Sequence, residues 1–247
     1  MLADSEQGRY VNAMNNVLII IPAYNEAENI ERVVDNLTGN YPQYDYVIIN
    51  DGSSDSTRKI CARRGYNMMD LPVNVGLSGA IKSGMRYANY YGYDYVVQLD
   101  GDGQHDPKYI EAMLAEMADS GCDIVIGSRF KTKRKPFTAR MFGSILITGA
   151  IRLTTGKHIG DVTSGMRLFN KKMIKQFGYD MHYSPEPDTL AFLLNSGVEI
   201  REVQVEMSER IAGTSYLTLW SSAWYMMRIM FSILLFQWVR KRPDTGR

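Results

Sequence analysis

The hydrophobic pattern of the first half of the chain predicts short strands that alternate with helices. Val17 to Ile21 is an unbroken apolar run, which is typical of a strand buried on both faces of a sheet. Similar runs predict four further strands, at residues 44–49, 67–71, 95–99 and 123–126. The segments between them predict helices at about 25–37, 56–64, 78–91 and 107–119. Strict alternation of this kind predicts an α/β fold with a mostly parallel, Rossmann-like sheet covered by helices on both faces.

Composition and charge narrow the class of protein. The chain has 247 residues, 45% of them hydrophobic, which is enough apolar material for the core of a globular domain. A formal net charge of +1 argues against a nucleic-acid-binding protein. Cys61 and Cys122 lie far apart, so we expect no disulfide framework and a reducing, cytoplasmic setting. Residues 1–16 are polar and show no signal-peptide pattern, and we expect a flexible tail there.

Two carboxylates that follow the fourth predicted strand are the strongest chemical signal. Asp100 and Asp102 come directly after the β-rich run that ends at Leu99, at a strand tip of the kind where open α/β sheets bind ligands. Carboxylate oxygens are ligands that Mg²⁺ and Mn²⁺ prefer, and these cations in turn bind diphosphates. The adjacent glycines allow a phosphate to approach the backbone. Taken alone, the segment is equally typical of an Asp-Gly turn after a strand.

Three more polar clusters follow predicted strands and belong at the same edge of the sheet. They are Pro22-Ala23-Tyr24-Asn25-Glu26, Asp51-Gly52-Ser53 with Asp55, and the segment from Asn74 to Gly79. Each cluster alone is compatible with turn chemistry. Four clusters in this order along the chain favour one shared site.

In combination, these clusters resemble the inverting family 2 glycosyltransferases of GT-A fold, over about residues 17–215. The resemblance implies that Asp100, Asp102 and Gln104 hold the metal and the sugar diphosphate. It also implies that a nucleotide-diphosphate sugar binds residues from all four clusters, namely Pro22, Ala23, Tyr24, Glu26, Asp51, Gly52, Ser53, Gly76, Gly79 and Asp100. The chain departs from many members at Asn50, where they carry a second Asp, but it retains Asp51, the position that usually matters.

Three later clusters look like the polyprenyl-phosphate glycosyltransferases of the dolichol-phosphate mannose synthase type. They are Gly127-Ser128-Arg129, the segment from Asp161 to Phe169, and Arg210-Ile211-Ala212-Gly213-Thr214-Ser215. In that group the acceptor is the phosphate of a membrane lipid. The resemblance implies that Arg129, Arg210, Ser215 and, with less weight, Arg167 bind this phosphate. The alternative for each arginine is a structural ion pair.

A phosphate acceptor changes what the site needs. A lipid monophosphate is already ionised near neutral pH, so the nucleophile needs little or no general base. Its charge must instead be brought beside a negatively charged sugar nucleotide, and the planar guanidinium of arginine binds phosphate with two donors. The metal would offset the charge that builds up on the departing diphosphate.

The segment Ser184-Pro185-Glu186-Pro187-Asp188 contains two carboxylates whose role the sequence leaves open. Family members that glycosylate a hydroxyl use a carboxylate near this position as general base, and Glu186 or Asp188 matches it. The other interpretation is that these residues cap the helix expected at 189–194 or orient an arginine.

Two segments predict contact with a membrane surface. Residues 217–239 are strongly apolar and aromatic with a narrow polar stripe, but Arg228 interrupts the roughly 20 apolar residues that a spanning helix needs. We expect an amphipathic helix in the membrane interface, and the alternatives are packing on the domain, pairing in a homo-oligomer, or spanning. The basic run from Lys131 to Lys135, followed by an amphipathic helix pattern, predicts a second membrane element, unless it is a solvated loop before a packed helix.

Together these patterns predict a tail at 1–16, a GT-A domain at 17–216 and an amphipathic helix within 217–247. The predicted function is metal-dependent, inverting transfer of a hexose from a UDP- or GDP-sugar to polyprenyl phosphate, on the inner face of the cell membrane. The candidate catalytic residues on this hypothesis are Asp102, Arg129 and Arg210. One alternative acceptor is a saccharide or lipid-linked saccharide hydroxyl in cell-envelope polysaccharide synthesis, with Glu186 or Asp188 as base. A second alternative, a silent nucleotide-sugar-binding module, is disfavoured by the intact metal motif.

Overall fold

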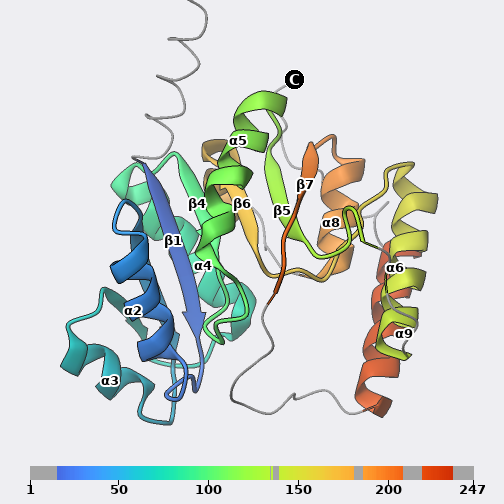
Figure 1. The fold of residues 1–247 in the computed structure, drawn as a ribbon. Helices are drawn as coiled ribbons and strands as arrows, with labels where there is room; N and C mark the ends of the chain where they lie inside the picture. Colours follow the sequence, from blue (N-terminus) through green and yellow to red (C-terminus); the bar gives the residue numbers. More distant parts are fainter. Residues whose placement is uncertain (1–15, 134, 136–138, 181–185, 208–218, 236–247) are drawn as a thin grey trace, which may run out of the picture.

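Seven strands form one sheet at the centre of the structure (Figure 1). This count refers to residues 16–133, 135, 139–180, 186–207 and 219–235, which the computed structural model describes. The strands are β1 (Val17–Ala23), β2 (Asp45–Asp51), β3 (Met68–Leu71), β4 (Tyr95–Gln98), β5 (Ile124–Ser128), β6 (Arg167–Asn170) and β7 (Ile200–Gln204). Their order is β3-β2-β1-β4-β6-β5-β7, and each neighbouring pair is parallel except the two that β6 forms with β4 and β5. The prediction of a mostly parallel sheet is therefore confirmed.

The sheet separates two hydrophobic cores, as the side chains of β1 show. Leu18 and Ile20 face one core, Ile19 and Ile21 face the other, and all four side chains are fully buried. The first core also contains residues of α4 (Gly76–Tyr91), α7 (Lys171–Lys175) and α8 (Pro187–Asn195). The second contains residues of α2 (Ile30–Asn40), α3 (Thr57–Arg64) and α5 (Ile110–Ser120), with the short 3₁₀ turn η1 (Pro107–Tyr109) leading into α5. An unbroken apolar strand is thus explained by helices on both faces.

Two further helices pack against each other at the end of the molecule opposite α2 and α3 (Figure 1). They are α6 (Ala139–Thr155) and α9 (Leu219–Leu235), and both also contact α8. Ile229 and Ile233 of α9 are buried in the first core, whereas Met227 and Phe231 are 51% and 59% exposed. In the part of the chain that the structure describes, no helix is long and apolar enough to cross a membrane.

Two parts of the fold differ from what the hydrophobic pattern predicts. The helix predicted from residue 25 begins at Ile30: Asn25 is excluded by its left-handed backbone conformation, with φ of 57°, and residues 27–29 form a turn. The pattern also predicts strands only as far as residue 126, and so misses β6 and β7. After α7 the chain adds a π-helical segment, η2 (Gln176–Asp180), before α8.

Candidate active site

The loops after β1 and β2 are fastened to each other at the C-terminal edge of the sheet. The main-chain N–H of Asn25 donates to Ser53 Oγ at 3.0 Å, and Asn25 Oδ1 accepts from the Ser54 N–H at 2.9 Å. Asp55 Oδ2 accepts from the Ala27 N–H at 3.1 Å, and Thr57 Oγ1 accepts from the Glu26 N–H at 2.9 Å. The two predicted clusters therefore form one rigid surface, because side chains of one satisfy main-chain donors of the other.

The third cluster is held to the second by Asp51. This aspartate is 3% exposed, and its Oδ1 accepts from the Val75 N–H at 2.8 Å. Gly52 has φ of 65°, and a Cβ there would lie 2.6 Å from the main-chain nitrogen of Asn74. The turn therefore requires glycine, because both its conformation and its close neighbour exclude a side chain.

The departure at Asn50 has a structural reason. Asn50 is buried, and its Nδ2 donates to Asp70 Oδ1 at 2.6 Å. A second Asp at this position would place two carboxylates against each other, whereas the amide donates a hydrogen bond. Tyr24, which the sequence predicts at the nucleotide, is 43% exposed in the loop after β1.

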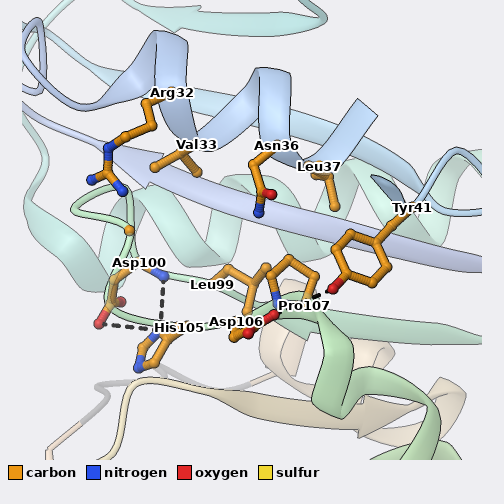
Figure 2. Close-up of a pocket in the computed structure, with 11 residues that line it drawn as sticks. Arg32, Val33, Asn36, Leu37, Tyr41, Leu99, Asp100, His105, Asp106 and Pro107 are labelled. Atoms are coloured by element: carbon orange, nitrogen blue, oxygen red, sulfur yellow. Dashed lines mark hydrogen bonds and ion pairs between the residues drawn. The ribbon is translucent and has the colours of Figure 1, made fainter. Parts of the chain in front are cut away.

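The predicted metal motif, which comprises residues 100–104, is fixed from two sides (Figure 2). His105, nearly buried, accepts the Asp100 N–H on Nδ1 at 3.2 Å. Arg32 of α2 donates from Nη2 to the Asp102 carbonyl oxygen at 3.2 Å, and its guanidinium covers Gly103. Asp102 is 4% exposed and its Oδ1 accepts from the Gln104 N–H at 3.0 Å, while the Asp100 side chain is 36% exposed. Two carboxylates are therefore preorganised on one turn.

Gly165 brings a distant segment against this motif. A Cβ at Gly165 would lie 2.4 Å from Asp100 Oδ2 and 2.8 Å from Oδ1, so only glycine lets the backbone approach the carboxylate this closely. Gly165 lies within the cluster from Asp161 to Phe169, and the sequence predicts no role for it. In the sequence Gly165 is only a glycine after Ser164, and this does not reveal a neighbour 65 positions earlier in the chain.

Arg129 is locked in place by Asp161. Arg129 Nε donates to Asp161 Oδ2 at 2.7 Å, and Nη2 donates to Oδ1 at 2.9 Å and to Thr163 Oγ1 at 3.1 Å. Asp161 is fully buried, and burial would raise its pKa, but the hydrogen bonds and charge of Arg129 hold that pKa below its usual value. The side chain of Arg129 remains 32% exposed. The site therefore presents a permanently charged guanidinium in one orientation.

The segment from Asp161 to Gly165 connects Arg129 with the metal motif. Glu202 of β7 anchors it by accepting the N–H groups of Gly160 and Asp161 at 2.8 and 2.9 Å. Ser164 Oγ donates to the Gly127 carbonyl oxygen at 2.6 Å. One end of the segment thus holds Arg129 and the other contacts Asp100. Glu202 was not singled out in the sequence because nothing near it marks a motif.

The structure corrects the assignment of Arg167 to the acceptor phosphate. Arg167 is the first residue of β6 and is fully buried, with no exposed surface. Its Nε donates to the Ser164 carbonyl oxygen at 3.0 Å and its Nη2 to the Val162 carbonyl oxygen at 3.4 Å. Its guanidinium serves the carbonyl groups of the 161–165 segment, so its role is to hold that segment in shape.

Glu186 and Asp188 both contact α9. Glu186 precedes α8 without a side-chain capping bond, and its Oε1 accepts from Arg228 Nη2 at 2.6 Å. Asp188 is 5% exposed, and its Oδ2 accepts from Ser232 Oγ at 2.7 Å. Of the two interpretations, the geometry agrees with orienting an arginine in the case of Glu186. Arg210 and Ser215 lie outside the described residues.

A pocket of about 340 Å³ borders the metal motif on the side of α2 (Figure 2). Its lining includes Asp100, Gly103 and His105 from the motif loop, Arg32 and Asn36 from α2, and Tyr41 just after α2. Tyr41 donates its hydroxyl to Asp106 Oδ1 at 3.3 Å across one end. Asp100 lines this pocket, whereas Tyr24 and Arg129 do not, so the pocket touches the predicted site only at the metal motif.

Comparison with known proteins identifies the family. The family model described as "Glycosyl transferase family 2" matches residues 18–178. The chain belongs to this family. The match contains the metal motif, Arg129 and the 161–165 segment, and ends before Glu186 and Arg210.

Two curated relatives of this glycosyltransferase align with most of its length. The polyprenol monophosphomannose synthase of Mycolicibacterium smegmatis is 27% identical, over 96% of this chain and 92% of the relative. The undecaprenyl-phosphate mannosyltransferase of Micrococcus luteus is 28% identical, over 82% and 87%. A crystal structure of glucosyl-3-phosphoglycerate synthase from Mycobacterium tuberculosis with Mn²⁺, UDP and glucosyl-3-phosphoglycerate superposes with a TM-score of 0.65 at 20% identity, covering 97% of this chain and 85% of the other. The predicted GT-A-type fold and glycosyltransferase activity are thereby confirmed.

Proposed function

We propose that this glycosyltransferase moves a hexose from a nucleotide-diphosphate sugar to a polyprenyl phosphate at a membrane surface, with inversion at the anomeric carbon. The observation that carries the proposal is the fixed guanidinium of Arg129, joined to the metal motif by the 161–165 segment. A cation held beside a diphosphate site fits an acceptor that is itself an anion. The names of the two curated relatives, which specify polyprenol and undecaprenyl phosphates, support the same acceptor class.

The residues present fit a divalent cation, Mg²⁺ or Mn²⁺. Asp100 and Asp102 would hold it, with Gln104 beside them. Within the described ranges no three His, Cys, Asp or Glu side chains form a closed metal site. Two carboxylates on one turn leave coordination positions for diphosphate oxygens and water, which is how Mg²⁺ is commonly held. When bound, the cation supplies positive charge beside the departing diphosphate.

The donor belongs at the edge formed by the first three clusters. Tyr24 exposes its ring there, and the hydrogen bonds through Asn25 and Asp51 hold the surrounding backbone still. A rigid edge of this kind binds the nucleotide without first ordering a loop. UDP and GDP sugars remain equal candidates, since nothing in these contacts selects one base.

The acceptor side needs charge rather than a base. The phosphate of a lipid monoester loses its second proton near pH 6, so an oxygen is ready to attack at neutral pH. Arg129 binds and orients that phosphate on the face of the sugar opposite the diphosphate, and attack from that face inverts the anomeric centre. The sequence predicts that Arg210 and Ser215 bind the same phosphate.

The membrane surface is part of the proposal. Helices α6 and α9 together expose large apolar side chains, namely Ile145, Leu146, Leu153, Met227, Phe231, Leu234 and Leu235. Exposed apolar side chains on two helices that pack against each other are typical of membrane or protein contacts. We place it against the inner face of the cell membrane, where a lipid acceptor and a cytoplasmic sugar nucleotide meet.

The test is a donor and acceptor panel. Purified protein with Mg²⁺ or Mn²⁺ is given labelled UDP- and GDP-sugars, each with and without undecaprenyl phosphate. We expect one donor to yield organic-phase label that mild acid releases, since a sugar phosphodiester is acid-labile. Transfer only to a saccharide hydroxyl would overturn the acceptor assignment and move attention to Glu186. No turnover with any donor would overturn the proposed reaction altogether.

A further inference from the structure

Two cations share one aromatic ring beside the 161–165 segment. The guanidinium carbon of Arg129 lies 5.2 Å from the centroid of the Phe130 ring, and Lys135 Nζ lies 5.6 Å from the same centroid. Both distances are within the range of cation–π attraction. Both positive groups therefore lie against the same ring, and the charge of Arg129 acts on Lys135.

The charges around this pair are unevenly matched. Arg129 is paired with Asp161, and Glu202 is occupied by two main-chain N–H groups. Lys135 donates instead to three neutral oxygens of α6: Ser144 Oγ at 2.8 Å, Thr148 Oγ1 at 3.0 Å and the Ser144 carbonyl oxygen at 3.4 Å. Among the described carboxylates, none lies within ion-pair distance of Lys135.

Desolvation of this ammonium points the same way. Burial lowers the pKa of Lys135, Asp161 and Glu202 partly raise it, and Arg129 lowers it further. An ammonium that has lost water without gaining a carboxylate is stabilised when an anion arrives. The next residue of α6 after Ser144 is Ile145, which is 39% exposed and belongs to the apolar surface described above. Lys135 is therefore bonded to the same helix that carries part of the exposed apolar side chains.

We propose that Lys135 is a second cation of the acceptor site, which binds the lipid phosphate together with Arg129 and selects a charged acceptor over a hydroxyl. This inference rests on the proposed function, because it needs a phosphate acceptor. Arg129 supplies a fixed, partly compensated charge, and Lys135 supplies the uncompensated one. Its flexible side chain can leave Ser144 and Thr148 for phosphate oxygens without moving the backbone.

The test measures binding and turnover separately. Binding of farnesyl phosphate, a short isoprenyl monophosphate, is measured by titration calorimetry for the wild type, Lys135→Gln, Lys135→Arg and Thr148→Val. Lys157→Met, at an exposed lysine just after α6, is the matched control. We expect Lys135→Gln to weaken binding roughly tenfold to hundredfold, and to raise KM for undecaprenyl phosphate alike while leaving donor KM unchanged. Thr148→Val and Lys157→Met should stay within about threefold of the wild type, and Lys135→Arg, which keeps the charge, should bind more tightly than Lys135→Gln.

These variants distinguish two roles of Lys135: supplying a charge that binds phosphate, and fastening its own segment to α6. If Thr148→Val weakens binding as much as Lys135→Gln, then Lys135 only fastens α6, and the proposal is wrong. Binding by Lys135→Gln at wild-type strength would also overturn it. The Lys135→Gln variant keeps a hydrogen-bond donor that can reach α6. If this variant does not fold, Lys135→Met is compared with the wild type instead. A wild type that binds farnesyl phosphate but transfers no sugar refutes the proposed function alone, whereas a wild type that does not bind it refutes both.

Discussion

The proposed donor edge, formed by the loops after β1, β2 and β4, and the proposed acceptor edge, formed by Arg129 and the 161–165 segment, are built in different ways. At the donor edge, the residues that the motifs mark contact each other directly, as Asn25 does with Ser53 and Ser54. At the acceptor edge, a motif marks Arg129, but Asp161 fixes the orientation of its guanidinium. Asp161 is in turn anchored by Glu202, which no motif marks. The difference follows from strand direction.

Parallel strands deliver their following loops to one edge automatically, which is why β1, β2 and β4 assemble the donor edge from successive motifs. β6 is antiparallel, so its beginning, rather than its end, lies at that edge. Arg167 pairs with Gln98 of β4 and Ile126 of β5, and the 161–165 segment that precedes it is thereby placed beside Asp100. A single reversed strand therefore joins the two halves of the site.

The largest expected effect is at the metal motif of the donor edge. Asp102→Asn keeps an oxygen that can accept the Gln104 N–H but removes the charge, so turnover should fall by roughly a thousandfold while the fold persists. Metal-dependent transfer and thermal unfolding are measured together. Asp119→Asn, at an exposed position in α5, is the control and should be neutral. Turnover within tenfold of the wild type would contradict the metal assignment.

The next effect tests the contact between the two edges. Gly165→Ala would place a methyl group 2.4 Å from Asp100 Oδ2, so the carboxylate must turn away. We expect turnover to fall about tenfold to hundredfold and the metal concentration for half-maximal rate to rise, because ligand placement matters at the 1 Å scale. The free energy of unfolding should change by only about 1 kcal/mol, since the Asp100 side chain is partly exposed.

Gly39→Ala is the matched control for this contact. Nothing lies within 4 Å of a Cβ at Gly39, in the last turn of α2, so the variant should be active and equally stable or slightly more stable. Equal turnover in Gly165→Ala and Gly39→Ala would show that the 161–165 segment does not position Asp100.

The smallest expected effect distinguishes the acceptors. Glu186 makes an exposed ion pair with Arg228, and such pairs contribute about 0–1 kcal/mol. If the acceptor is a phosphate that needs no base, Glu186→Gln should keep turnover with undecaprenyl phosphate within about twofold. A hundredfold loss in the initial rate would instead indicate a general base and favour a hydroxyl acceptor.

The sequence predicts most of the donor edge and less of the acceptor edge, for reasons visible in single residues. Asp51, Asp100 and Asp102 follow apolar runs, so their place at strand tips can be read from order alone. Arg167 shows the limit: an arginine in a motif suggests a ligand, but only strand pairing reveals that it starts a central strand and is fully buried.

By itself, the sequence determined the parallel α/β core, the donor motifs and the family, because strand burial and turn chemistry are local properties of consecutive residues. The tertiary structure decided which distant groups meet: Gly165 with Asp100, Asp161 with Arg129 and Glu202, and Lys135 with α6. Those contacts depend on the position and direction of β6 in the sheet and on the packing of α6. No local sequence pattern predicts the placement of β6 or the packing of α6, because each depends on contacts between residues far apart in the chain.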